Sequence, residues 1–380
     1  ICEVNMKKAS LIISIIIFII SCFIAYDVIN RKEEIHFIPT IKEIDDGVKS
    51  IKFKVDTFYL AIGESEKLNY DIESSKDDYK LTWSSENEDI VSISDGKIVG
   101  VNLGTSVVTL KSESGKKAEV SVTVTDLIRK PELDDKKKFL PCHAYTEEEA
   151  HIIDEALRTR VLNKGEGTRA ALIETIRFMT LSFKYKVSYF YENGRMHESG
   201  VRKADGEGRY YHKGLYLSED KFKDIKVSHK GPAIWGCPLT NLQDHNRYKP
   251  GAKMPNGLDC SGFVTWSLYN SGLDVGDIGA GINDRHKDMS DVGEMHSLTY
   301  EYANSGDYKV GDVIARWGHT ALIAGKDSEY LYIAESLLKG VRIEKVSYKN
   351  PNSSLYKYYA YINKMDKEYS KNDDYTDMWE

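Results

Sequence analysis

An uncharged, isoleucine-rich run near the start of this 380-residue chain constrains its folding more than any other feature. The run covers residues 9–26 and follows Lys7 and Lys8. Eighteen helical residues span about 27 Å, close to the ~30 Å of a bilayer's hydrocarbon core. A secretory signal peptide has a shorter apolar core and a small-residue cleavage site, which this run lacks. The sequence therefore predicts a transmembrane signal anchor over residues 7–29.

The two lysines predict the orientation of this anchor, because positive charges stay on the cytoplasmic side. We expect a single-pass protein of the cell membrane whose remaining residues lie outside, on the cell-wall side. One alternative is a lipoprotein, since the sequence Ile19-Ile20-Ser21-Cys22 is similar to a lipobox with Cys22 as the lipidated residue. Apolar residues continue past Cys22 and favour the anchor. A buried core helix is a third alternative, but no amphipathic pattern marks it.

Charge and cysteine content exclude several classes of protein. Lys plus Arg number 52 and Asp plus Glu number 59, so the formal net charge is −7 and we expect no nucleic-acid partner. Five cysteines are too few and too scattered for a disulfide scaffold or a paired structural zinc site. We interpret Cys142 and Cys237 as buried thiols, with a disulfide between them as the less favoured alternative. The sequence suggests no metal and no cofactor.

A small β domain follows a polar spacer over residues 30–50. Short strand-like runs separated by turns occupy residues 51–126, and this spacing is typical of an all-β sandwich. Apolar residues alternate with polar ones over residues 118–124, which predicts a strand with one buried face. We expect Trp83 to belong to the core of this domain.

Three local patterns in this region resemble bacterial Ig-like domains of group 2. They are Trp83-Ser84-Ser85, a hairpin between Gly96 and Gly100, and Gly104-Thr105. The resemblance covers residues 51–126. It implies a spacer or adhesive unit on a bacterial surface, and we expect no catalytic chemistry from it.

A charged linker over residues 127–145 leads to a larger unit with helical and strand patterns. Thr146 and Glu149 form a capping box that predicts the start of a helix. A second helix is predicted over 169–183 and a strand over 185–191. Residues 259–272 predict a further helix that ends at Gly272. Cys260 would then lie in its first turn, where unpaired amides and the helix dipole favour a thiolate.

Two antiparallel strands are predicted further along the chain, and they carry the partners that a thiolate needs. Residues 310–325 predict a strand, a turn at Trp317-Gly318, and a second strand that begins at His319. Residues 330–336 predict a neighbouring strand with Glu335 near its end. This pairing could place Glu335 beside His319. A carboxylate in that position fixes the imidazole tautomer and supports the imidazolium that pairs with a thiolate.

These residues resemble the NlpC/P60 family of cell-wall cysteine peptidases. The matching segments are Asp259 to Val264, Gly311-Asp312 before a strand, and Gly318-His319 at the start of the next. The resemblance is strong over residues 230–345 and weaker before them, so we divide residues 146–365 into an extension (146–229) and a catalytic core (230–365). An acidic tail, expected to be disordered, occupies 366–380. One departure is Ala233, where many family members have a tyrosine.

The resemblance implies a papain-like α+β fold with Cys260 as nucleophile, His319 as general base and Glu335 as the third catalytic residue. It also makes Asp259, Ser261 and Trp235 candidate substrate-binding residues. The sequence as a whole therefore predicts a multidomain chain: an N-terminal transmembrane helix, an all-β Ig-like sandwich and a papain-like catalytic domain.

The function that the resemblance implies is hydrolysis of amide bonds in peptidoglycan stem peptides, between γ-D-glutamate and the diamino acid. An N-acetylmuramoyl-L-alanine amidase would use the same three residues. An acyltransferase is a further alternative, since only the acceptor differs. A non-catalytic adhesin or scaffold is the alternative outside enzymes, and the presence of both Cys260 and His319 argues against it.

Overall fold

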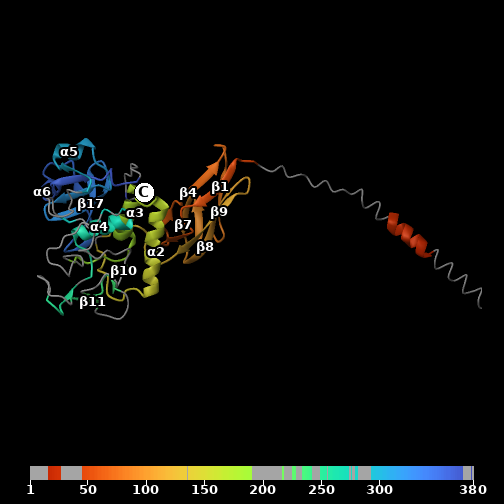
Figure 1. Cartoon of the computed structure of the whole chain (residues 1–380), viewed down its shortest axis with the longest axis horizontal. Helices are drawn as coiled ribbons and strands as arrows, with labels where there is room; N and C mark the ends of the chain where they lie inside the picture. The colour runs from red at the N-terminus through yellow and green to blue at the C-terminus, as the bar shows by residue number, and fades with distance from the viewer. Residues whose placement is uncertain are drawn as a thin grey trace, which may run out of the picture. The chain divides into compact units, whose positions relative to one another are not determined.

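The computed structural model describes residues 16–26, 45–134, 136–190, 216–217, 225–227, 233–241, 249–254, 256–273, 275, 279–280, 292–370 and 378. The chain divides into two units, Ile1–Asp45 and Asp46–Glu380, which are considered separately (Figure 1). The predicted multidomain organisation, with a β-rich N-terminal region followed by helices and strands, is confirmed.

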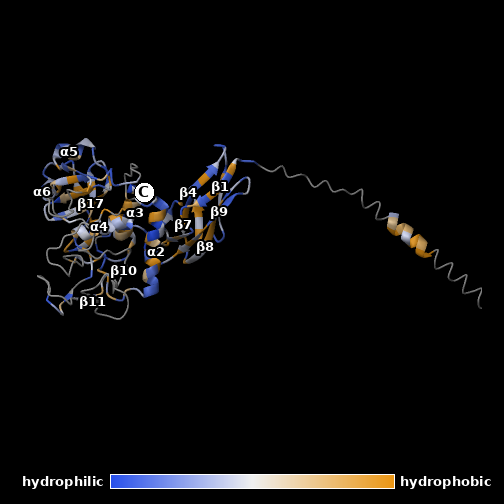
Figure 2. Cartoon of the chain, in the orientation of Figure 1, coloured by the Kyte–Doolittle hydropathy of each residue, from blue (hydrophilic) through white to orange (hydrophobic). Residues whose placement is uncertain are grey.

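In the first unit, the described residues form a helix over 16–26 that is coloured mostly hydrophobic in Figure 2. Its isoleucine and phenylalanine side chains are exposed. The remainder of the predicted anchor, 7–15 and 27–29, lies outside the described residues, as does the spacer up to residue 44. Among the helices that the structure describes, none has the length and apolar character needed to cross a membrane.

The second unit begins with nine strands that enclose one apolar core. The largest sheet has the order β2-β9-β8-β5, beside a three-stranded sheet β3-β7-β6 and the pair β1-β4. Trp83 packs against Phe53 and Tyr70 at the edge of this core, as expected. The first strand begins before the predicted boundary at residue 51. The strands are β1 Val48–Phe53, β2 Thr57–Leu60, β3 Ser65–Glu66, β4 Tyr70–Ser74, β5 Leu81–Ser85, β6 Val91–Ser94, β7 Lys97–Gly100, β8 Gly104–Ser112 and β9 Lys117–Val124.

The rest of the unit is built on a six-stranded antiparallel sheet with the order β15-β20-β16-β17-β18-β19. Helix α4 packs against its central strands β17 and β18, and α3 packs against α4. The helices are α2 Glu147–Lys164, α3 Arg169–Arg177, the π-helical turn η1 Phe178–Ser182, α4 Cys260–Asn270, α5 Tyr300–Ser305 and α6 Ser354–Tyr358. The strands are β10 Tyr216–Leu217, β11 Ile225–Val227, β12 Ala233–Ile234, β13 Leu239–Asn241, β14 Lys253–Met254, β15 Glu294–Ser297, β16 Val313–Arg316, β17 His319–Lys326, β18 Tyr330–Leu337, β19 Gly340–Ser347 and β20 Tyr361–Lys364.

The predicted helix starts are confirmed by their capping hydrogen bonds. Thr146 and Glu149 form the capping box of α2, and the Asp259 carboxylate accepts a hydrogen bond from the Gly262 N–H at the start of α4. The predicted strand over 185–191 is wrong for its described residues. Instead, this backbone connects two other segments: Lys186 exchanges backbone hydrogen bonds with the 138–140 segment, and the Ser188 carbonyl accepts one from the Leu258 N–H.

A buried network of ion pairs joins the β domain to α2 and α3. Arg160 on α2 contacts Glu64 at 2.7 Å and Glu174 at 3.3 Å, and all three side chains are 1% exposed. Arg177 and Lys164 pair with Glu66. Three basic side chains therefore face three acidic ones, and the two predicted domains share a continuous interior.

Two segments predicted to be peripheral belong to the core. Within the predicted linker, Ile128 and Leu140 are buried. The prediction that residues 366–380 are disordered is wrong for their described part. Tyr369 is buried, its hydroxyl donates a hydrogen bond to the Gly311 carbonyl, and the Arg169 guanidinium lies 4.3 Å from its ring. Residues 371–377 and 379–380 lie outside the described residues.

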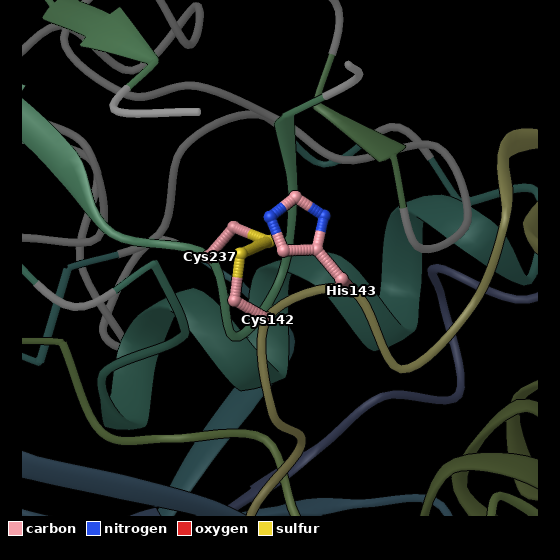
Figure 3. A group of neighbouring side chains, drawn as sticks. All are labelled: Cys142, His143 and Cys237. Carbon is pink, nitrogen blue, oxygen red and sulfur yellow. A yellow bond between two sulfur atoms is a disulfide. The ribbon is translucent and has the colours of Figure 1, made fainter. Parts of the chain in front are cut away.

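The interpretation of Cys142 and Cys237 as buried thiols is wrong, because the two form a disulfide (Figure 3). It connects the segment before α2 to the Trp235-Gly236-Cys237 turn. Gly236 has a φ of +89°, and an added Cβ would lie 2.3 Å from the Leu140 carbonyl oxygen, so the turn needs glycine. The His143 ring lies near the two sulfur atoms. Because the two cysteines are bonded to each other, neither is a thiolate that could bind a metal.

We expect that Cys142→Ala/Cys237→Ala will lower the free energy of unfolding by about 2–4 kcal/mol. The disulfide spans 95 residues, so it removes much conformational freedom from the unfolded chain. Denaturant unfolding measures the loss. Dithiothreitol should destabilise the wild-type chain to a similar extent and leave the variant unchanged. A wild-type chain that is insensitive to dithiothreitol would show that the bridge is not formed.

Candidate active site

His319 is the first residue of β17, and a tight turn places it there. Strand β16 pairs with β17 so that Arg316 lies opposite His319. Between them Gly318 has a φ of +77°, which a side chain would disfavour. The side chain of His319 is 3% exposed, and its ring packs against the rings of Tyr358 and Tyr359. The hairpin therefore fixes both the position and the surroundings of the imidazole.

Glu335 binds this imidazole, as the strand pairing predicts. Strand β18 lies next to β17, and Glu335 Oε2 is 2.8 Å from His319 Nε2. A carboxylate only accepts hydrogen bonds, so Nε2 carries the proton. The neutral ring then has its lone pair on Nδ1, which is the nitrogen that can take a proton from a thiol or from water. The juxtaposition of His319 and Glu335 is confirmed, while their catalytic role stays a prediction.

Two further side chains hold Glu335 from its other sides. Arg342 on β19 donates from Nε and Nη2 to Glu335 Oε1 at 2.9 and 2.7 Å. The Tyr359 hydroxyl donates to Oε2 at 2.9 Å. Burial alone would raise the pKa of Glu335, but hydrogen bonds from His319 and Arg342 outweigh it and lower the pKa to about 2. Glu335 is therefore ionised at neutral pH.

Cys260 is the first residue of α4 and is buried, with 6% of its surface exposed. The packing of α4 on β17 and β18 brings the start of this helix toward the strands that carry His319 and Glu335. One hydrogen bond ties these parts together directly: Ser336 Oγ donates to the Leu258 carbonyl at 2.8 Å. Leu258 and Ser336 are near neighbours of Cys260 and Glu335 in the chain. The thiol thus lies at the N-terminal end of a helix dipole, which favours a thiolate.

The three candidate substrate-binding residues are all described and mostly buried. Asp259 is the N-cap of α4, and Ser261 Oγ lies 3.3 Å from its carboxylate. Trp235 is fully buried against Trp266, with ring centroids 5.4 Å apart. The structure displays capping and packing roles for these residues, and their contact with substrate stays a prediction.

Sequence reasoning missed Arg342 and Tyr359. Arg342 lies directly opposite Glu335 in the β18–β19 pairing. A hairpin turn at residues 338–339 would have predicted this pairing from the sequence. No local signal pointed to Tyr359, which reaches Glu335 from the end of α6. Asp312, part of the Gly311-Asp312 motif, is a structural residue. Its carboxylate binds Arg169 and the Met365 N–H, which ties α3 and the chain end to the sheet.

Comparison with known proteins gives no family assignment. No family profile and no curated protein matches the chain. Among solved structures, domains 4 and 5 of the S-layer protein SbsC are 20% identical over 20% of this chain and 52% of that one, with a TM-score of 0.19. A structure of SbsC domains 4–9 is 18% identical over 26% of this chain and 18% of that one, with a TM-score of 0.19. An intimin mutant of EHEC O157:H7 is 14% identical over 29% of this chain and 64% of that one, with a TM-score of 0.17.

With TM-scores this low, these likenesses carry no argument about fold or function. The chain also spans only about half of the first of these structures. The resemblances to bacterial Ig-like domains and to the NlpC/P60 family therefore stay predictions.

Proposed function

We propose that this chain is a cysteine hydrolase that cuts amide bonds in peptidoglycan stem peptides, between γ-D-glutamate and the diamino acid. The observation that carries the proposal is the buried His319–Glu335 pair on strands β17 and β18, against which the helix that begins at Cys260 packs. A carboxylate-oriented imidazole with a helix-start thiol is the arrangement that nucleophilic catalysis by cysteine requires. The substrate class comes from the NlpC/P60 resemblance, and with it the papain-like fold.

The chemical steps follow from the assigned proton positions. The Cys260 thiolate attacks the carbonyl carbon, and the His319 imidazolium gives its Nδ1 proton to the leaving amine. The backbone N–H of Cys260, at the start of α4, is the proposed donor to the oxyanion. Neutral His319 then takes a proton from water, whose oxygen attacks the thioester and releases the carboxylic acid product and the Cys260 thiolate, so that the thiolate–imidazolium pair is restored. Glu335 stays ionised and supports the imidazolium throughout.

We place the enzyme outside the cytoplasm, anchored in the membrane through residues 9–26. The disulfide between Cys142 and Cys237 supports export, since such bridges persist in oxidising compartments. The Ig-like module would carry the hydrolase toward the wall. Because buried ion pairs join this module to α2 and α3, it would act as a rigid extension rather than a loose tether.

The test is digestion of purified peptidoglycan by a soluble chain that starts at residue 31, with Cys260→Ala as the matched control. Mass spectrometry should find fragments with a new amino-terminal diamino acid in the wild-type digest alone. Intact stem peptides that begin with L-alanine would assign the amidase activity instead. Wall binding with no cleavage by either protein would favour the scaffold alternative.

A further inference from the structure

A cavity of about 490 Å³ lies beside β19, the edge strand of the six-stranded sheet, and is separate from the proposed active site. Neither Cys260 nor His319 lines it. Its walls come from the segment before α2, from η1 and the residues after it, and from β19 with the turn before it. Its volume is within the range of ~300–1,000 Å³ that is usual for small-ligand sites. Five basic side chains line it: Lys137, Lys186, Lys339, Arg342 and Lys345.

Acidic side chains offset only part of this charge. Two line the cavity, and each already binds an arginine: Asp134 accepts from Arg129 at 2.9 Å, and Glu344 accepts from Arg342 at 2.8 Å. The lining side chains therefore carry a formal surplus of three positive charges, or two when Glu335, which also binds Arg342, is counted, in a chain whose formal net charge is −7. Lys339 is exposed and makes no hydrogen bond or ion pair with the part of the chain that the structure describes.

Lys137 shows that the positive charges act on one another. Its ammonium donates to the Thr180 and Phe183 carbonyls at 2.8 and 2.9 Å, which fixes it in the wall. Burial, together with the charges of Arg129 and Lys186, lowers the pKa of Lys137 to about 7, against the opposing charge of Asp134. A bound anion would relieve this repulsion, whereas a cation or a neutral ligand would not.

Arg342 offers a donor to such an anion without leaving Glu335. Its Nε and Nη2 hold Glu335 and Glu344, and Nη1 makes no hydrogen bond with the described residues. The side chain is 28% exposed and lines the cavity. Guanidinium and ammonium groups together match the charge and the acceptor oxygens of phosphate groups.

We propose that this cavity is a binding site for a compact phosphate-type anion, a diphosphate in particular, held by Lys186, Lys339 and Arg342. The inference does not depend on the proposed hydrolase activity, because it stands on a separate cavity and is tested by binding alone. Arg342 is the one side chain that belongs both to this cavity and to the contacts of Glu335.

The test is isothermal titration of the full chain with inorganic pyrophosphate in phosphate-free buffer of low ionic strength. We expect saturable binding that Lys186→Ala/Lys339→Ala weakens by roughly tenfold or more, since charge-assisted hydrogen bonds are lost. The matched control is Lys97→Ala/Lys116→Ala, which removes two exposed lysines of the β domain and changes the net charge equally. It should bind within about twofold of the wild type, because neither lysine lines the cavity.

The proposal is overturned if the wild-type chain shows no saturable binding, or if both double variants lose affinity to the same extent. The second result would assign the binding to overall charge rather than to the cavity. Because Lys186 and Lys339 are not core residues, melting temperatures near the wild-type value are expected for both variants, and they confirm that the comparison is between folded proteins.

Discussion

Glu335→Gln is expected to lower the rate of substrate hydrolysis by about 10²- to 10⁴-fold while the chain remains folded. The carboxylate holds the proton of His319 on Nε2 and so leaves Nδ1 as the base. A glutamine amide can present its N–H₂ group to Nε2 instead, which favours the opposite tautomer. It also removes the negative charge that supports the imidazolium. The rate of Cys260 alkylation as a function of pH measures the same effect without a substrate.

Glu344→Gln is the matched control for this variant. Glu344 binds the same Arg342 guanidinium but, among the described residues, makes no hydrogen bond with His319. The Glu344→Gln variant should retain activity within a few-fold of the wild type, because Arg342 keeps its two hydrogen bonds to Glu335. If both variants lost activity equally, the charge around Arg342 would matter and the orientation of His319 would not.

The pH dependence of Glu335 separates its roles in stability and catalysis. Its pKa lies below the ordinary value of 4.5, at about 2. Its ionised form therefore stabilises the fold fully above pH 4.5, and this contribution is lost as the pH falls toward 2. The acidic limb of an activity profile between pH 5 and 8 must then come from another group. In acid unfolding, the Glu335→Gln variant should lose less stability than the wild type below pH 4.5.

Local patterns were enough to predict the parts of the site that lie close together in the sequence. The capping residues Thr146 and Asp259 fixed two helix starts, and the Trp317-Gly318 turn fixed the strand pair that begins at His319. Antiparallel neighbours then brought Glu335 to the imidazole. Each of these features depends on turns, caps and periodicity, which a short stretch of sequence contains in full.

The features that the sequence did not reveal all depend on long-range packing. Tyr359 contacts Glu335 only because the segment after α6 returns to the sheet. Cys142 and Cys237 are separated by 95 residues, and their pairing follows from a loop contact that no periodicity encodes. The predicted linker does not separate the β domain from the rest of the second unit, because Arg160 and Glu64 form a buried ion pair between them that no local pattern distinguishes from surface charge.

Arg160→Met is expected to lower the free energy of unfolding by about 3–5 kcal/mol. Arg160 is fully buried and binds Glu64 and Glu174, and its Nη2 also donates to the Tyr59 carbonyl at 2.9 Å. Methionine fills similar space but leaves the Glu64 carboxylate in the interior without its arginine, while Glu174 keeps only Arg177. Such an uncompensated charge costs far more than the pair itself contributes. Urea unfolding of the soluble chain gives the measurement.

Arg158→Met is the matched control, since Arg158 lies on the same helix and pairs with Glu155 at the surface. Its side chain is 50% exposed, so we expect a loss below about 1 kcal/mol. Adding Glu64→Gln and Glu174→Gln to Arg160→Met should recover part of the lost stability, because the buried charge is removed. Equal losses for Arg158→Met and Arg160→Met would mean that the network is hydrated. The β domain would then be a flexibly attached module instead of a rigid extension of the unit that carries His319 and Glu335.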